Sequence, residues 1–319
     1  MKCLCCGKEF SSENLQNGWH KRCIRNFFGT DKLPVLEVDK EHLEVLAENS
    51  VQKGLTVPGV QKKMLLHLFS DAKKPRLMLV NYPTGYILKP QVEEFEALPE
   101  AEQLTMSMAD KAGIATVPHA LMPLQDELAY ITRRVDRSWK KNGVAMLAME
   151  DFCQLDLRLT QDKYKGSYER CAKIIEKYSF TKGLDRAEMF MRLVFSFMVG
   201  NSDMHLKNFS LIESEEGSGE YHLSPAYDLL PVNVVMPEDK EQFALTMNGK
   251  KLNIRRKDFF VFAEECGLQK ASAEKMIEKF ISMKELYTGM CEQSLLPEYM
   301  KERFCNLIEG RTKILQGDS

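Results

Sequence analysis

The chain has 319 residues and is 44% hydrophobic, which is enough to bury a substantial core. Its formal net charge of −2 gives no whole-chain electrostatic footprint for DNA or RNA, so we expect no direct nucleic-acid partner. No apolar run reaches the ~18 residues needed to cross a bilayer, because Arg192 interrupts the best candidate, and the first residues lack the apolar stretch of a secretory signal.

The nine cysteines indicate a reducing compartment. Their number is odd, and after a first cluster they are dispersed along the chain, which does not suit a disulfide framework. We therefore expect a cytoplasmic protein that has no membrane partner.

The N-terminal cluster has the spacing of a metal site. It follows the pattern C-x2-C-x13-H-x2-C, formed by Cys3, Cys6, His20 and Cys23. This is the pairwise spacing of a tetrahedral structural zinc site, in which each pair chelates Zn²⁺ from one short turn. The aromatic residues that are candidates to cover the ion are Phe10, Trp19 and Phe27.

Zinc would also stabilise a segment that is too short to fold alone. A segment of fewer than about 30 residues cannot build its own core, and structural zinc contributes roughly 10 to 16 kcal/mol of apparent binding free energy at neutral pH. The sequence thus predicts a zinc-stabilised element at residues 1–29, in which Cys5 is spare. Free cytosolic thiols, a redox pair and a nucleic-acid zinc knuckle are the alternatives.

A glycine-punctuated segment at residues 53–61 leads into an apolar stretch at residues 64–69. Backbone amides in such a loop can close over phosphates, although a pair of glycines alone is equally typical of an ordinary hairpin. The loop residues that we expect to bind ATP are Gly54, Val57, Gly59 and Gln61.

A second apolar stretch, residues 85–88, ends at Lys89, and a helical pattern runs from Glu102 to Ala112. A strand lysine can reach the α- and β-phosphates of ATP, and a glutamate on the following helix can pair with it, as kinases require. Alone, both residues would be solvated charges of an exposed strand and helix. Their order before an Asp/Asn loop and a further aspartate is the order of parts in a two-lobed kinase.

The strongest signal follows residues 188–199, which are apolar nearly all round and predict a helix buried in a large lobe. Gly200 and Asn201 end that helix, and Asp203 then stands five positions before Asn208. Asp203 is the candidate to accept or orient the proton of an attacking hydroxyl. Asn208 and Asp228 are candidates to hold Mg²⁺, the first through a neutral amide oxygen and the second through an anionic oxygen.

His205 and Lys207 complete the candidate catalytic set, either by offsetting phosphate charge or by bracing the loop. The alternative is a surface turn after a buried helix, because Asn, Ser and Asp are turn formers. Short strands are predicted at residues 209–212 and 221–223, joined by an acidic turn at 213–220, and the second strand delivers Asp228 to the same cleft as Asn208.

The last third of the chain has helical spacing. Helices are predicted at residues 258–266, 271–284 and 297–315, with Gly267 as a stop. A local basic patch consists of Lys250, Lys251 and residues 255–257. The simplest interpretation of this patch is a solvated face.

Together these motifs resemble the HipA family of bacterial serine/threonine kinase toxins. The resemblance rests on the run Gly-Asn-Ser-Asp-x-His-x-Lys-Asn-Phe-Ser, on Pro-Ala-Tyr-Asp-Leu-Leu downstream, and on four upstream segments at residues 57–63, 86–90, 98–102 and 149–154. It implies an ATP- and Mg²⁺-dependent kinase that phosphorylates a host protein and so inhibits translation and growth. The target class that it implies is an aminoacyl-tRNA synthetase.

Two features depart from the family pattern. Many relatives carry serine in the glycine loop, where self-phosphorylation switches activity off; here Thr56 is the remaining acceptor, and Pro58 has no backbone N–H to donate to a phosphate. The glycine loop also arrives by residue 54, which resembles HipT, a short form whose missing subdomain is a separate protein. The resemblance thus implies a HipS-like small partner besides a HipB-like DNA-binding antitoxin.

The predicted fold is α+β, two-lobed and kinase-like. A small mixed β N-lobe is expected at residues 30–137 and a mainly helical C-lobe at residues 138–319, after the Cys/His element. Two other functions stay open. A phosphatidylinositol-type lipid kinase shares the Asp-x-His-x-x-Asn loop, but the chain lacks a basic or amphipathic membrane-binding segment. A catalytically silent binding module is less consistent with the complete set Lys89, Asp203, Asn208 and Asp228.

Overall fold

A computed structural model describes residues 2–9, 15–37, 63–69, 74–79, 84–140 and 143–317. The chain divides into two compact units. The first consists of Met1–Gln103 and Val117–Arg134, and the second of Leu104–Thr116 and Val135–Ser319. Among the described residues, no helix combines the length and the apolar character that a membrane span requires.

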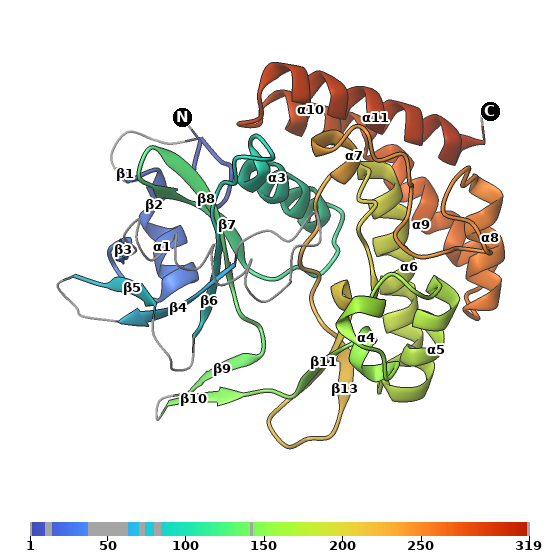
Figure 1. The fold of residues 1–319 in the computed structure, drawn as a ribbon, viewed down its shortest axis with the longest axis horizontal. Helices are drawn as coiled ribbons and strands as arrows, with labels where there is room; N and C mark the ends of the chain where they lie inside the picture. The colour runs from blue at the N-terminus through green and yellow to red at the C-terminus, as the bar shows by residue number, and fades with distance from the viewer. Residues whose placement is uncertain are drawn as a thin grey trace. The chain divides into compact units, whose positions relative to one another are not determined.

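The first unit is built on a mixed sheet of six strands (Figure 1). The strands are β3 (Val35–Glu37), β4 (Met64–Phe69), β5 (Arg76–Leu79), β6 (Tyr86–Lys89), β7 (His119–Leu124) and β8 (Glu127–Arg133). Their order is β3-β5-β4-β6-β8-β7, and only the β3–β5 pair is parallel. Along β4 the side chains alternate, so that Met64, Leu66 and Leu68 are buried while Leu65 and Phe69 are exposed, as expected for a strand with one covered face.

The N-terminal Cys/His element packs against this sheet. It contains β1 (Leu15–Gln16), β2 (Trp19–His20) and α1 (Lys21–Phe28), and α1 ends where Gly29 adopts a left-handed backbone. Trp19 is fully buried and donates its ring N–H to the carbonyl of Leu121 in β7 at 3.0 Å. Because Trp19 and the buried face of α1 belong to the same hydrophobic cluster as the sheet, the element takes its core from the sheet rather than forming one alone.

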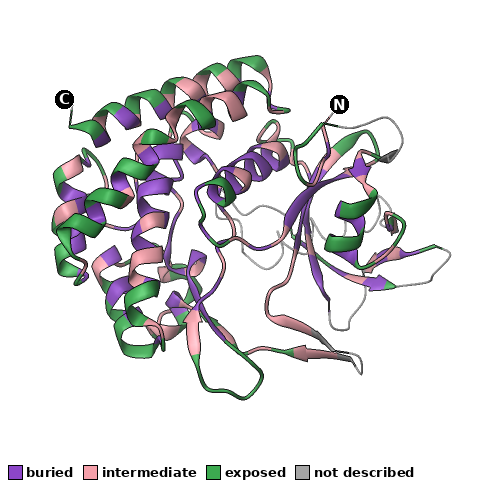
Figure 2. Cartoon of the chain, turned by 180° about the vertical axis from the view of Figure 1, so that it is seen from behind, coloured by how far each residue is buried: buried purple, intermediate pink, exposed green. Residues whose placement is uncertain are grey.

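The second unit is mainly helical. Its helices are the end of α3 (Leu98–Lys111), α4 (Phe152–Leu155), α5 (Tyr168–Tyr178), α6 (Lys182–Val199), α7 (Val232–Val235), α8 (Arg256–Glu265), α9 (Lys270–Ser282), α10 (Lys284–Glu292) and α11 (Glu298–Gln316). The central helix α6 packs against α5, α9 and α11 (Figure 1). Figure 2 shows most of α6 as buried, in agreement with the apolar run at its C-terminal half.

Small sheets complete the second unit. A three-stranded antiparallel sheet has the order β11-β12-β13, with β11 at Met149–Asp151, β12 at Ser210–Glu213 and β13 at Tyr221–Leu223. A separate hairpin pairs β9 (Arg137–Lys140) with β10 (Gly143–Met146). Two short 3₁₀ turns, η1 (Thr160–Asp162) and η2 (Leu206–Asn208), lie in the connections.

The predicted elements agree with the observed ones to within a few residues. The strands at 64–69 and 221–223, the helix that contains 102–111, the buried helix that ends at Val199 and the three C-terminal helices are confirmed. The strand predicted at 209–212 is observed as Ser210–Glu213. The observed helices α1, α4, α5, α7 and α10 were not predicted.

Candidate functional site

The loop that carries Asp203 and Asn208 begins at a sharp helix end. Gly200 has a φ of 70°, a left-handed value that favours glycine, and it follows directly after α6. A Cβ at this position would lie 3.0 Å from the side chain of Leu307 and 3.2 Å from that of Asn233. The left-handed conformation of Gly200 ends the buried helix and fixes the direction in which the backbone continues. The polar residues that follow are therefore held at the C-terminal end of α6.

Asp203 has one carboxylate oxygen engaged by a tyrosine. The hydroxyl of Tyr164 donates to Oδ1 of Asp203 at 2.8 Å, and Oδ2 lies 4.0 Å from Nε2 of His205. The ring of Tyr164 meets that of His205 edge-on at 5.1 Å. Since the Asp203 side chain is 42% exposed, the carboxylate is both oriented by the protein and accessible.

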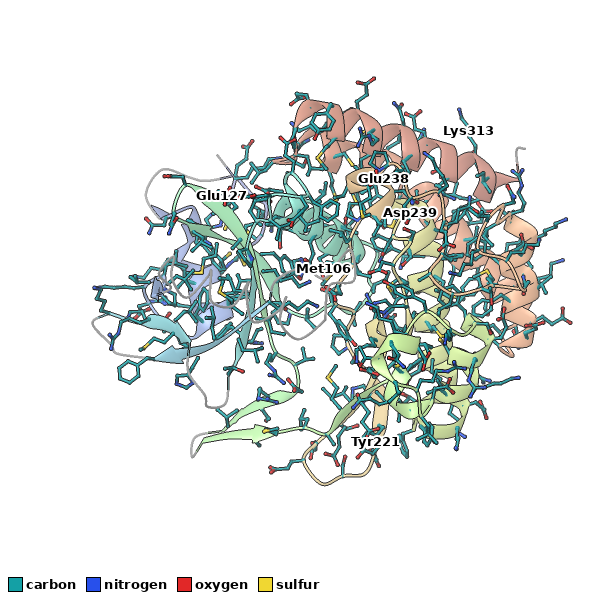
Figure 3. All side chains as sticks on the ribbon, in the orientation of Figure 1. Met106, Glu127, Tyr221, Glu238, Asp239 and Lys313 are labelled. Atoms are coloured by element: carbon teal, nitrogen blue, oxygen red, sulfur yellow. The ribbon has the colours of Figure 1, made fainter. Side chains whose placement is uncertain are left out.

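The surroundings of Asp203 act on its pKa in opposite directions. Burial raises the pKa of Asp203, whereas the Tyr164 hydrogen bond and the charge of Lys163 lower it. The carboxylates of Asp228 and Asp239 add to the increase, and the net change is upward. Asp239, labelled in Figure 3, lies on the segment after α7. Burial and the Asp203 charge raise the pKa of Tyr164, so its hydroxyl stays protonated and remains a donor.

Asn208 and Asp228 meet in the second unit. The amide nitrogen of Asn208 donates to the backbone carbonyl of Asp228 at 3.5 Å, and the backbone N–H of Asn208 donates to the carbonyl of His205 at 2.9 Å. Asp228 has a φ of 60°, a strained conformation for a residue other than glycine. Because the side-chain nitrogen of Asn208 faces the backbone of Asp228, its amide oxygen is the atom suited to a cation.

Lys207 is anchored on both its side chain and its backbone. Its Nζ donates to Oδ2 of Asp151 at 2.5 Å, and its carbonyl accepts the hydroxyl of Tyr227 at 3.0 Å. The Tyr227 hydroxyl also lies 2.5 Å from Oγ of Ser210. These contacts join the Asp203–Asn208 loop to β11, to β12 and to the segment before Asp228.

Buried charges hold the segment that delivers Asp228. Arg192, fully buried in α6, donates to the carbonyl of Ser224 at 2.7 Å and to Glu188 at 3.0 Å. Asp185, at the start of α6, accepts from the backbone N–H of Leu223 at 2.8 Å. The last residue of the short strand β13 and the residue after it are thus tied to the central helix.

In the first unit, Lys89 and Glu102 form a buried ion pair. The two side chains are 5% and 1% exposed, and Nζ of Lys89 lies 2.5 Å from Oε1 of Glu102. The ring of Tyr130 lies 5.2 Å from the same Nζ. A buried charge needs a partner, and here β6 and α3 supply one each. The glycine-loop candidates Gly54, Thr56, Val57, Gly59 and Gln61 lie outside the described residues.

The four N-terminal metal-ligand candidates come together. One ligand atom from each of Cys3, Cys6, His20 and Cys23 lies within 4.8 Å of all the others. Nδ1 of His20 is 3.4 Å from the sulfur of Cys6 and 3.9 Å from that of Cys23. Zinc–sulfur bonds of about 2.3 Å in a tetrahedron imply sulfur–sulfur distances of roughly 3.8 Å. The donor set and its size therefore fit a tetrahedral zinc ion.

The thiols of this cluster differ in acidity. Burial opposes ionisation of Cys3, but backbone N–H groups, among them that of His20 at 3.4 Å, outweigh it and lower the pKa of Cys3. Burial and the charge of Cys3 raise the pKa of Cys5 to about 12. Burial and the neighbouring sulfurs also raise the pKa of Cys23. Several thiolates this close repel one another, and a bound dication would remove that repulsion.

Three residues of this site were not given a role from sequence. Tyr164 and Tyr227 reach the loop from distant positions, and no local pattern marks a tyrosine hydroxyl as a loop anchor. Asp151 carried a signal that was available, because Asp-x-x-Gln before an apolar residue is a capping pattern that predicts a helix start. That pattern does not reveal Lys207, which is 56 residues away in sequence.

Comparison with known proteins identifies related chains. The model of the "HipA-like C-terminal domain" family matches residues 55–286. A "Putative kinase" of Haemophilus influenzae is 26% identical over 277 residues, covering 77% of this chain and 78% of that protein. "Putative kinase Y4mE" of Sinorhizobium fredii is 25% identical over 279 residues, covering 83% of this chain and 65% of that protein.

Solved structures share the fold. A chain of the Shewanella oneidensis MR-1 toxin–antitoxin complex of HipA, HipB and operator DNA matches with a TM-score of 0.68 and 18% identity, over 85% of this chain and 71% of that one. The Helicobacter pylori proinflammatory kinase CtkA matches with a TM-score of 0.54 and 14% identity, over 79% of this chain and 95% of that one. At these identities the likeness establishes a mixed α/β fold of the HipA and CtkA kind.

Proposed function

Since the chain belongs to the HipA-like C-terminal domain family, we propose that it is an ATP- and Mg²⁺-dependent serine/threonine protein kinase and the toxin of a bacterial toxin–antitoxin system. The observation that carries the proposal is that Asn208, on the same loop as Asp203, donates to the backbone carbonyl of Asp228. These are the residue types that a phosphotransferase needs for its metal and its nucleophile. The names of the relatives and the shared fold support the same class of enzyme.

Each side chain of the second unit has a distinct role in this proposal. Asp203 accepts or orients the proton of the substrate hydroxyl through the oxygen that Tyr164 does not hold. Asn208 and Asp228 provide oxygens for Mg²⁺, which, when bound, offsets the charge of the β- and γ-phosphates. His205 lies close enough to Asp203 to help orient its carboxylate. The loop in this way binds and aligns groups, which is most of what phosphoryl transfer requires of a protein.

The first unit holds the phosphate end of the nucleotide in this proposal. Glu102 orients Lys89 so that its ammonium can contact the α- and β-phosphates. Gly54, Val57, Gly59 and Gln61 are proposed to contribute backbone amides of the glycine loop, and Thr56 to be its autophosphorylation site. We assign a small β N-lobe at residues 30–137 and a helical C-lobe at residues 138–319, in the manner of a two-lobed kinase.

Zinc is the proposed structural metal of the N-terminal element. The ligands are Cys3, Cys6, His20 and Cys23, whose donor atoms lie within 4.8 Å of one another. When bound, zinc supplies cross-links between the first turn and the start of α1. It takes no part in phosphate transfer in this proposal.

The proposed substrate is a host protein, with an aminoacyl-tRNA synthetase as the class that the family resemblance implies. The proposed partners are a HipB-like DNA-binding antitoxin and a HipS-like small protein. One structural match is a chain of a complex that contains HipA, HipB and operator DNA, which supports an antitoxin partner of the first kind.

Labelled ATP provides the direct test of this function. The native chain, Asp203→Asn and Asp228→Asn are incubated with γ-labelled ATP and Mg²⁺ in a bacterial lysate. We expect label in a soluble protein on serine or threonine with the native chain, and a loss of roughly 100-fold or more in each variant, because each removes a group that acts on the transferred phosphate. Thermal unfolding of the variants serves as the folding control.

The other outcomes identify the alternatives. Label that enters the lipid fraction supports a lipid kinase. The complete absence of label, with folded protein and after removal of any bound antitoxin, supports a silent binding module and contradicts the kinase proposal.

A further inference from the structure

The segment Met149–Gln154 lies beside the residues that directly follow the Asp203–Asn208 loop. Its strand β11 pairs with β12, so that Asp151 stands opposite Ser210. Directly after it, the backbone N–H of Phe152 donates to the carbonyl of Phe209 at 2.9 Å, and the two phenylalanine rings stack at 5.5 Å. This segment therefore contacts the residue that follows Asn208 through both backbone and side chain.

The two oxygens of Asp151 have separate partners. Oδ1 accepts the backbone N–H of Gln154 at 2.9 Å, and the Gln154 side chain accepts the backbone N–H of Asp151 at 2.9 Å, which together form a capping box at the start of α4. Oδ2 accepts from Nζ of Lys207 at 2.5 Å. One carboxylate thus joins the beginning of a helix to the residue next to Asn208.

The Asp151–Lys207 pair has the setting of an effective ion pair. The Asp151 side chain is 13% exposed and that of Lys207 is 33% exposed, so water screens the pair less than it screens a surface pair. Tyr227 holds the carbonyl of the same lysine. With its ammonium directed to Asp151 and its carbonyl to Tyr227, Lys207 is fixed at two points immediately before Asn208.

We propose that Asp151 is a positioning residue that, through Lys207, sets where Asn208 and Asp203 present their oxygens to the metal–nucleotide. The inference rests on the phosphotransfer function proposed above. In this account Lys207 braces the loop and does not contact phosphate. Asp151 itself touches neither substrate nor metal.

Two substitutions separate the positioning role of Asp151 from its capping role. Asp151→Asn keeps a good N-cap, because asparagine caps helices about as well as aspartate, but it removes the charge that holds Lys207. Gln154→Ala removes the reciprocal half of the capping box and leaves the Asp151–Lys207 pair in place. The first variant therefore tests the ion pair, and the second is its matched control.

The kinetic experiment measures kcat, the KM for ATP and the Mg²⁺ concentration at half-maximal rate. We expect Asp151→Asn to lower kcat by roughly tenfold to 100-fold and to raise the Mg²⁺ requirement, because a displacement of about 1 Å at a metal ligand has effects of this size. Its unfolding midpoint should fall only modestly, because asparagine keeps the helix cap and the Lys207 side chain is 33% exposed. Gln154→Ala should keep native kcat and lose some thermal stability.

Lys207 variants test whether the pair acts as a unit. Lys207→Gln should match Asp151→Asn, the double variant should be no worse than either single one, and Lys207→Arg should restore most of the rate. If the single losses multiply in the double variant, or if Asp151→Asn has native kcat and native Mg²⁺ requirement, the positioning role is wrong.

Hydrogen exchange decides the same question without activity. Amides of residues 203–209 should exchange faster in Asp151→Asn than in the native chain, and at the native rate in Gln154→Ala. Unchanged exchange in Asp151→Asn overturns the inference. A native chain that transfers no phosphate overturns the kinase function instead, and the two failures are therefore distinguishable.

Discussion

At the scale of single residues, the site depends on how one carboxylate is shared. Tyr164 holds Oδ1 of Asp203, and Oδ2 faces His205 at 4.0 Å. A carboxylate that accepts one hydrogen bond from the protein keeps a defined orientation and still has an oxygen for a substrate hydroxyl. Tyr164 thus positions Asp203 through a hydrogen bond, in the same way as we propose that Asp151 positions Lys207.

Removal of the Tyr164 hydroxyl should change the pH dependence of activity. Burial raises the pKa of Asp203 and the Tyr164 hydrogen bond lowers it, so Tyr164→Phe should raise that pKa further. Because the base must be ionised, the acidic limb of the kcat/KM profile should move to higher pH. Activity above that limb should fall much less. The measurement is kcat/KM for phosphate transfer across the acidic to neutral range.

The other charged and titratable groups around Asp203 stay in place in this variant, namely Lys163, Asp228, Asp239 and the imidazole of His205. Tyr178→Phe is the matched control, because Tyr178 has the same 38% exposure as Tyr164 and lies on α5 without a hydrogen bond to Asp203. An acidic limb that stays in place in Tyr164→Phe contradicts the shared-carboxylate account.

At the scale of elements, the end of α6 determines where the loop starts. Gly200 combines a left-handed φ of 70° with Leu307 and Asn233 close to the position of a Cβ. Gly183, in the first turn of the same helix, has helical geometry and no atom within 4 Å of a Cβ. The position of Gly200 therefore requires glycine, whereas the position of Gly183 can accept a side chain.

Alanine at the two positions should change stability in opposite directions. Gly200→Ala should lower the free energy of unfolding by at least about 1 to 2 kcal/mol, since an L-residue is strained at positive φ. Gly183→Ala should raise it by about 0.5 to 1 kcal/mol, because alanine is the better helix former. Urea unfolding of both variants provides the comparison, and a Gly200→Ala protein as stable as Gly183→Ala would contradict this view of the helix end.

At the scale of the whole molecule, the Cys/His element depends on the sheet for its core and on its four donor atoms for local order. Trp19, Phe27 and Phe28 pack with Tyr86 of β6, with ring centroids of Phe28 and Tyr86 5.4 Å apart. Without a metal, no bond would link the buried sulfurs of Cys3 and Cys23 to each other. Loss of zinc should thus lower the local stability of the Cys/His element.

Protein purified without chelator should contain one zinc ion per chain. EDTA should lower the unfolding midpoint of the first unit, because metal binding free energy contributes to folding. Cys23→Ser should lose the metal and reproduce this effect, whereas Cys5→Ser should retain zinc, since Cys5 is not among the four convergent donors. Metal analysis that finds no zinc in native protein, or equal zinc loss in both variants, would disprove the proposed site.

Much of the architecture followed from local patterns. The apolar run before Gly200, the alternation along Met64–Phe69 and the helical spacing after Asp258 each reflect burial of one face or one segment, and they predicted α6, β4, α8, α9 and α11. The resemblance to the HipA family is confirmed by the match over residues 55–286. The division into three domains and the roles of the individual site residues stay predictions.

The sequence by itself determined the residue types of the candidate site, because Asp203, Asn208, Asp228 and the C-x2-C…H-x2-C spacing are short-range patterns with a chemical reason. Only the tertiary structure decided their supports. Asp151 meets Lys207 across 56 positions and Tyr164 meets Asp203 across 39. Such pairs leave no periodic trace in the chain, since a hydrogen bond depends on where folded segments come together and not on their separation in sequence.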